Sequence, residues 1–365
     1  MPDKLDKSLG FIGGIYEIRR GMTVHKVDGD TIYASQGYEI LCSLDGGKSW
    51  QVDGSIPVPA WRKAVDSFPL LKRMSRGGVS HFLRQTDGSR LCILPKVLMR
   101  AEAGSSEYES VFHFSRGSRP LNLCQGGDGK IYWGEYFLNL RRSQPVHIYC
   151  SEDRGITWNV SYTFPKGSIC HVHRITYDPY DDAYLVCTGD RDREVAILKT
   201  TDGFRTLKPV VQGEQRYRTT SLMVLPQGIL YGTDNPSGEN YIMALDRRSG
   251  SVDRIQKLPG PALYGCQVGN HTVFATMVER QHHEVSLWSG DERGFSLLAY
   301  LGTRKWNRPL RELAGYPTAI LPEGKSNWPY LYFTPVGTGE YAHSLVRMDL
   351  NVVLSKNAES TRLGA

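Results

Sequence analysis

Short segments in which apolar and polar residues alternate recur along the whole chain, and most of them meet a Gly, Asp or Pro turn. Clear examples are 128–133 (DGKIYW), 181–186 (DDAYLV), 226–231 (PQGILY) and 269–274 (GNHTVF). Alternation over four to eight residues is typical of strands with one buried face. The pattern therefore predicts an all-β protein built from many short antiparallel strands.

An octapeptide occurs twice between such segments. Residues 43–50 (SLDGGKSW) and 151–158 (SEDRGITW) both read Ser-x-Asp-x-Gly-x-(Ser/Thr)-Trp, and 200–207 (TTDGFRTL) is a weaker third copy. The Asp carboxylate can accept hydrogen bonds from turn N–H groups, the Gly permits a positive φ, and the Trp can pack between neighbouring sheets. Repetition of a turn motif predicts an array of small sheets.

The spacing of the turn aspartates sets the number of repeats. These residues are Asp45, Asp153, Asp202, Asp246, Asp291 and Asp349, with gaps of 108, 49, 44, 45 and 58 residues. The first gap is about two periods long, so one blade without the motif is expected around Met99–Val111. We therefore predict a seven-bladed β-propeller of four-stranded antiparallel blades, with six blades as the alternative.

The octapeptide resembles the Asp-box, or BNR repeat, of sialidase-like β-propellers. The resemblance implies that each copy is the turn between the third and fourth strands of a blade. It also implies a relationship in architecture to propeller glycosidases and polysaccharide lyases. A true sialidase is not expected, because that family has an Arg-Ile-Pro motif in its first blade and this chain has Ile18-Arg-Arg-Gly-Met22 there.

Composition adds limits on compartment and partners. The 365 residues are predicted to form one propeller domain, 1–365, with insertions near 59–77 and 303–315. The seven cysteines have no metal or redox spacing and are expected to be buried thiols. Reduced thiols favour a cytoplasmic protein. An exported protein whose leader had been removed would have the same sequence features. No apolar stretch is long enough for a membrane span or a signal peptide. The net charge of +6 suits an acidic ligand. Nucleic acid is not expected as a partner, because the chain has no run of basic residues. The protein is expected to be a monomer.

The blade topology directs attention to one face of the disk. The start of each first strand and the loop between the second and third strands share a face, and the octapeptide turns lie on the other. On the first face, His171 and His173 of the sequence Cys-His-Val-His-Arg (170–174) should lie on one side of a strand. Two such imidazoles can bind a divalent metal, can supply a general base with an orienting partner, or can simply be structural.

Other polar residues are expected on the same face. Asp190 follows a strand and should point inward, and the sequence Gln-Arg-Tyr-Arg (215–218) places Arg216 and Arg218 on one side of a strand, where they could hold a carboxylate. Two loops follow a glycine that lets the backbone turn inward, and they carry Glu135, Tyr136 and Asp234. Arg119 and Tyr264 are expected at the starts of first strands. The acidic groups could act as acid and base, or could anchor the arginines.

These residues lead to three hypotheses. The first is an enzyme that cleaves a uronate-containing glycan by β-elimination: Arg216, Arg218 or a metal neutralises the carboxylate, His171 or His173 removes the proton, and Tyr136 or Tyr264 protonates the leaving oxygen. The second is a glycoside hydrolase that uses Glu135 with Asp234 or Asp190. The third is a non-enzymatic scaffold or glycan-binding propeller.

Overall fold

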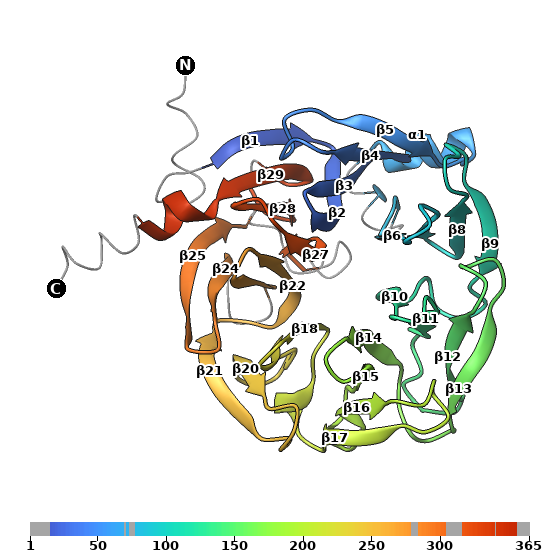
Figure 1. Ribbon diagram of the computed structural model, residues 1–365, viewed down its shortest axis with the longest axis vertical. Coiled ribbons are helices and arrows are strands. Elements are labelled where there is room, and N and C mark those ends of the chain that lie inside the picture. The colour runs from blue at the N-terminus through green and yellow to red at the C-terminus, as the bar shows by residue number, and fades with distance from the viewer. Residues whose placement is uncertain are drawn as a thin grey trace.

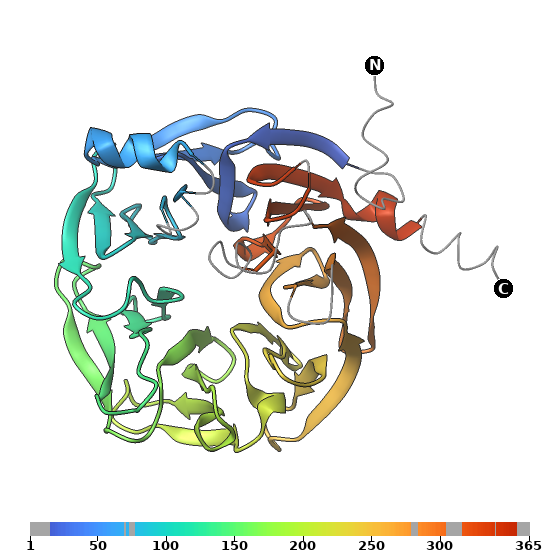
Figure 2. The same ribbon diagram turned by 180° about the vertical axis from the view of Figure 1, so that it is seen from behind.

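The strands are arranged around a central axis as the blades of a propeller (Figures 1 and 2). The computed structural model describes residues 15–68, 71–72, 77–278, 284–303, 316–339 and 341–355. Within these residues, antiparallel four-stranded units predominate. The prediction of an all-β propeller is confirmed.

Five blades are separate four-stranded sheets. In chain order the first four consist of β6 (His81–Arg84), β7 (Arg90–Leu94), β8 (Val97–Ala101) and β9 (Glu109–His113); β10 (Cys124–Gln125), β11 (Ile131–Gly134), β12 (Val146–Ser151) and β13 (Asn159–Phe164); β14 (Val172–Asp178), β15 (Ala183–Thr188), β16 (Ala196–Thr200) and β17 (Lys208–Gln212); β18 (Ser221–Leu225), β19 (Gly228–Gly232), β20 (Asn240–Leu245) and β21 (Val252–Leu258). The β6–β9 blade fills the long gap between the first two octapeptides, as expected.

The fifth blade contains both the first and the last strands of the described chain. Its order is β26 (Thr318–Ile320), β28 (Tyr330–Val336), β29 (Ser344–Asp349) and β1 (Ile15–Arg20). The strand β1 pairs antiparallel with β29, so the two strands lie side by side at the opposite ends of the colour scale in Figure 1. Asp349 ends β29, and the fourth strand comes from the other end of the sequence rather than from a hairpin.

The remaining strands form one continuous nine-stranded sheet, called here the double sheet. It joins β2 (Met22–Gly29), β3 (Thr31–Gln36), β4 (Glu39–Ser43) and β5 (Gln51–Ser55) to β22 (Ala262–Val268), β23 (His271–Thr276), β24 (Glu284–Asp291) and β25 (Gly294–Gly302). The link is β27 (Glu323–Ser326), which pairs in parallel with both β2 and β22. The prediction of seven separate blades, and the alternative of six, are therefore wrong.

The sequence of β27 explains why this link was missed. Glu-Gly-Lys-Ser reads as a polar turn, without the alternation of a strand. Gly324 has φ +96°, and a Cβ built on it would lie 2.1 Å from the Val27 carbonyl oxygen. Only glycine permits this combination of backbone angle and close approach to β2.

The octapeptide turns are held by the aspartate side chains. Asp153, between β12 and β13, accepts hydrogen bonds from the Thr157 N–H at 2.9 Å, the Thr157 hydroxyl at 2.5 Å and the Ser151 hydroxyl at 2.8 Å. Asp45 and Asp202 make the same kinds of bonds between β4 and β5 and between β16 and β17. Each aspartate thus replaces the water that would otherwise solvate the turn N–H groups.

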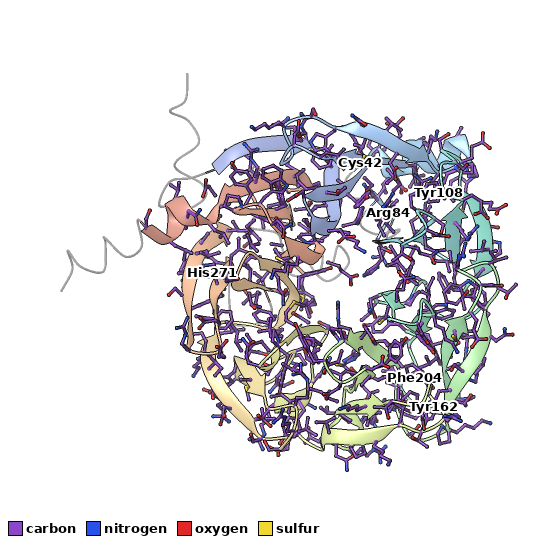
Figure 3. The ribbon with its side chains drawn as sticks, viewed as in Figure 1. Cys42, Arg84, Tyr108, Tyr162, Phe204 and His271 are labelled. Carbon is purple, nitrogen blue, oxygen red and sulfur yellow. The ribbon has the colours of Figure 1, made fainter. Side chains whose placement is uncertain are left out.

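Apolar clusters fill the spaces between neighbouring four-stranded units. In one of them, Phe204 from the third octapeptide copy packs with Tyr162 and Tyr132 of the preceding blade; Tyr162 and Phe204 are adjacent in Figure 3. Gly134 and Gly232 belong to this packing. An added Cβ on Gly134 would lie 2.5 Å from the Val172 side chain, and one on Gly232 would lie 2.4 Å from Ala262. The two glycines are required by close packing of blades, and the predicted sharp turn of the backbone is not their role.

The insertion at 59–77 contains the helix α1 (Ala60–Asp66), and its residues 69–70 and 73–76 lie outside the described residues. Of the 303–315 insertion, only Thr303 is described. All seven cysteines are free, and six of them are buried, as predicted. None of the described helices has the length and apolar character needed to cross a lipid bilayer.

Candidate functional site

A cavity of about 330 Å³ lies on the axis, at the end where the first strands begin. Its walls come from first strands and their preceding residues (His25, His81, Arg119, His173, Arg218 and Tyr264) and from loops between second and third strands (Tyr136, Asp234, Pro236 and Met277). These are the two classes of position that the topology assigns to one face. The volume is at the small end of the range for small-molecule sites, about 300–1,000 Å³.

Two histidines and an aspartate cluster at the wall of the cavity, and of the three only His173 lines it. His171 and His173 lie at the start of β14, where a bulge interrupts pairing with β15, and their Nε2 atoms are 3.1 Å apart. The Asp190 carboxylate lies 3.6 Å from His171 Nε2 and 3.5 Å from His173 Nε2. Asp190 has φ +141°, a conformation that non-glycine residues rarely adopt. The structure thus brings both histidines and Asp190 together.

The hydrogen bonds determine how the imidazoles are protonated. His171 Nδ1 lies 3.2 Å from the Phe137 carbonyl oxygen, which can only accept, so this nitrogen carries the proton. Burial, with smaller contributions from His173 and Arg218, lowers the pKa of His171 to about 4. Its Nε2 therefore presents a lone pair to His173 and Asp190 at neutral pH. His173 Nδ1 is buried and has no hydrogen-bond partner among the described residues.

Arg218 connects Asp190 to a second carboxylate. One guanidinium nitrogen lies 3.2 Å from Asp190 Oδ1, and Nε lies 3.2 Å from Asp234 Oδ2. Burial raises the pKa of Asp234, and Arg218 opposes this only in part. Burial would also raise the pKa of Asp190, but the hydrogen bond from His173 and the nearby His171 and Arg218 hold it well below its ordinary value. Two carboxyl groups whose pKa values shift in opposite directions thus contact the same guanidinium group.

The loop between β11 and β12 covers the histidines. Tyr136 lies with its ring 4.1 Å from the His171 ring. Glu135, predicted to be catalytic, instead forms a buried ion pair with Arg116 and accepts a hydrogen bond from the His147 N–H at 2.8 Å. It does not line the cavity, because the guanidinium and the backbone occupy both of its oxygens.

A second buried ion pair ties this loop to the one that carries Asp190. Arg142 Nε and Nη2 each lie 2.7 Å from an oxygen of Glu194, and the side chains are 4% and 0% exposed. Glu194 lies in the short 3₁₀ helix η1 (Asp192–Glu194). The sequence did not identify Arg142 as the partner of Glu194, because the two residues are 52 positions apart.

Arg216 is the clearest correction among the predicted site residues. Residues Gln215–Tyr217 form the 3₁₀ helix η2 rather than a strand, so Arg216 and Arg218 do not share a face. Arg216 bonds to Glu214 and to the Tyr217 hydroxyl, away from the cavity. Arg218 alone of the two reaches the site.

The opposite wall of the cavity is also polar. Burial and Arg119 together lower the pKa values of His25 and His81, that of His25 to about 3, and burial raises the pKa of Tyr264. Arg174 and Glu323 were missed at the sequence level; they line the cavity as an ion pair at 3.2 Å. Arg174 directly follows His173, but Glu323 comes from β27, which the sequence did not reveal. The lining thus holds three arginines against two carboxylates, and the lowered pKa values leave His25 and His81 neutral at pH 7.

The central cluster has a geometry compatible with a divalent metal. Ligand atoms of Cys170, His171 and Asp190 all lie within 4.8 Å of one another, and the two imidazole Nε2 atoms are 3.1 Å apart. Metal–nitrogen bonds of about 2.0–2.1 Å place tetrahedral ligands about 3.3–3.4 Å from each other. Two imidazoles and a carboxylate suit zinc, manganese or iron. These residues therefore fit such an ion.

Comparison with known proteins identifies the fold only. No protein-family model and no curated protein sequence matches the chain. Similar solved structures include a chain of a mitotic checkpoint complex (TM-score 0.57, 9% identity, 93% of this chain and 96% of that chain). They also include an oligogalacturonate lyase in complex with manganese (0.57, 10%, 93% and 96%) and an ancestral GH74 enzyme (0.55, 12%, 91% and 47%). The chain is thus similar to propellers from both enzymes and protein assemblies.

Proposed function

We propose that the protein is a carbohydrate-active enzyme that cleaves a uronate-containing oligosaccharide by β-elimination. The observation that carries the proposal is His173, which lines the cavity together with Tyr136 and three arginines and which contacts His171 and Asp190 behind the cavity wall. A neutral imidazole with an orienting carboxylate is the usual form of a general base. Two of the similar solved structures are an oligogalacturonate lyase and a GH74 enzyme, which is consistent with glycan chemistry on this fold.

The proposed reaction assigns a role to each group. Arg218 and Arg119 hold the sugar carboxylate, which makes the hydrogen on the adjacent carbon more acidic. His173, oriented by Asp190, takes that proton; the electrons of the C5–H bond form the C4–C5 double bond while the C4–O bond breaks. Tyr136 or Tyr264 donates a proton to the departing oxygen. The pKa of Tyr264 is raised by burial, so its hydroxyl is protonated at neutral pH. No water is consumed.

A divalent ion at His171, His173 and Asp190 would supply Lewis-acid neutralisation of the sugar carboxylate. His173 would then be a metal ligand and not the general base, and Tyr136 and Tyr264 would remain as the proton-transfer groups of the chain. Metal analysis of the purified protein, before and after dialysis against a chelator, separates the two versions. Binding of about one ion per chain that is lost in Asp190→Ala supports the ligand role.

The experiment is a spectrophotometric assay on oligogalacturonates and other uronate oligosaccharides. Elimination produces a double bond conjugated to the carboxylate, which absorbs in the ultraviolet. Replacing His173 with Ala should lower kcat by at least about 100-fold, the usual contribution of a general base. His113→Ala is the control, because His113 is an exposed residue of β9. Absence of the absorbance on every uronate substrate would overturn the proposal and favour a binding scaffold.

Hydrolysis is a second candidate, favoured by the opposite pKa shifts of Asp190 and Asp234. Pairs of carboxyl groups with separated pKa values are typical of glycosidases, where one acts as acid and the other as base or nucleophile. Glu135 is not a member of this pair, because Arg116 neutralises it. Release of reducing ends without ultraviolet absorbance, lost in Asp234→Asn, would identify hydrolysis.

A further inference from the structure

A second hollow opens beside the central cavity, between two neighbouring four-stranded units. This inter-blade groove has a volume of about 760 Å³ and lies between the β19–β20 loop (235–240), the β21–β22 connection (257–261), and Trp288 and Tyr300 of β24 and β25. Pro236 lines both the groove and the central cavity. The groove is therefore a continuation of the candidate site toward the rim of the disk.

The floor of the groove is aromatic and rigid. Tyr300 lies opposite Ser286 in the β24–β25 register, and Trp288 is two residues from Ser286, so the three side chains share one face of the sheet. The indole N–H of Trp288 donates to the Ser286 hydroxyl at 2.8 Å, which fixes the ring. Tyr300 is 39% exposed, and Pro236, Pro259 and Pro261 add further apolar surface. Both aromatic side chains line the groove and so can contact a ligand in it.

The polar rim is ordered by its own hydrogen bonds. Asn240 accepts from the Asn235 N–H at 2.8 Å and donates to the Asn235 carbonyl oxygen at 2.9 Å, which closes the loop. The charged residues that line the groove, Glu239 and Lys257, pair with each other. The groove is thus nearly neutral, in contrast to the arginine-rich cavity beside it. It suits a ligand that combines apolar faces with hydroxyl groups, which describes a pyranose ring.

We propose that the inter-blade groove is a second carbohydrate subsite, which binds further sugar residues of a chain whose acidic residue occupies the central cavity. The inference rests on the proposed function and specifies its substrate: an oligosaccharide rather than a mono- or disaccharide. The C–H faces of a pyranose stack on Trp288 and Tyr300, and its hydroxyls contact the polar rim. Recognition in the groove depends on stacking, whereas recognition in the cavity depends on charge.

The test compares a digalacturonate with a pentagalacturonate in Trp288→Ala and Tyr300→Ala. Each variant should lower kcat/KM by about tenfold for the pentamer, the effect of losing one aromatic contact, and leave the dimer within about twofold. Tyr300→Ala guards against misfolding, because Tyr300 is exposed. Trp61→Ala on α1 is the control, since Trp61 is 64% exposed and lines neither hollow. Equal losses for both substrates, or no loss for either, would overturn the subsite.

Binding measured by calorimetry separates this inference from the proposed function. The probes are pentagalacturonate and xylopentaose, added to the wild-type protein and to Trp288→Ala. Binding that requires Trp288 without any turnover supports the groove and rejects the enzyme. Turnover of the pentamer with affinity unchanged in Trp288→Ala supports the enzyme and rejects the groove. Neither binding nor turnover rejects both.

Discussion

Removing one partner of the buried Arg142–Glu194 pair should strongly destabilise the protein. Glu194→Ala removes two charged hydrogen bonds of 2.7 Å. The Arg142 side chain, which is 4% exposed, loses its counter-ion and keeps the hydrogen bond that it donates to the Leu140 carbonyl oxygen. An uncompensated buried charge costs about 3–5 kcal/mol. We therefore expect the free energy of unfolding to fall by that amount, measured by urea denaturation with tryptophan fluorescence.

A double variant separates the charge effect from the loss of packing. Arg142→Met with Glu194→Met removes both charges and keeps much of the volume, so it should be more stable than Glu194→Ala by at least about 2 kcal/mol. Glu152→Ala is the control; it breaks the exposed Lys130–Glu152 pair, and surface pairs contribute about 0–1 kcal/mol. A cost below about 1 kcal/mol for Glu194→Ala, or no recovery in the double variant, would refute the reasoning.

Three further perturbations probe the turns, the buried histidines and the blade packing. Asp153→Ala should lower stability in urea by about 1–2 kcal/mol, because three turn bonds lose their acceptor; no change would contradict that role. His25 is neutral when folded, with a pKa lowered to about 3, so stability is lost as the pH falls from about 6.5 toward 3. Between pH 7 and pH 5 the fall in the free energy of unfolding should be about 2 kcal/mol smaller in His25→Gln than in the wild type. The same pH dependence in both proteins would contradict the neutral state of His25. Gly134→Ala should lower the thermal midpoint by overpacking Val172, with partial rescue by Val172→Ala; a midpoint equal to wild type would contradict the contact.

The parts of this protein that the sequence predicts are those encoded locally. The octapeptide turns could be recognised because Asp153 and Thr157 are four residues apart and satisfy each other. Strand periodicity placed His171 and His173 on one side, although β14 begins only at Val172 and a bulge lies at His173. Arg216 was misplaced because a single 3₁₀ turn, for which the residues give no clear signal, replaces the expected strand.

Features that depend on distant parts of the chain were not predictable. The partner of Glu194 lies 52 residues away, and the partner of Arg174 lies 149 residues away in β27. Nothing in the local pattern of β27 indicates a strand, since its hydrogen bonds come from β2 and β22 and not from a hairpin. The count of separate blades and the charge balance of the cavity both depend on that short segment.

The pairing of β1 with β29 has a consequence for how the ring is made during synthesis. Residues Ile15–Arg20 are translated long before their partner and can pair only when Ser344–Asp349 has been translated. Until then, the outer edge of the growing structure stays unpaired, and the neighbouring Gly21 N–H lacks its acceptor, the His343 carbonyl oxygen. Interblade contacts can form early, but this blade is completed only after β29 has been translated. Mechanical or thermal opening should begin at the same seam, because hydrogen bonds hold β1 against β29 there and no short hairpin joins the two strands.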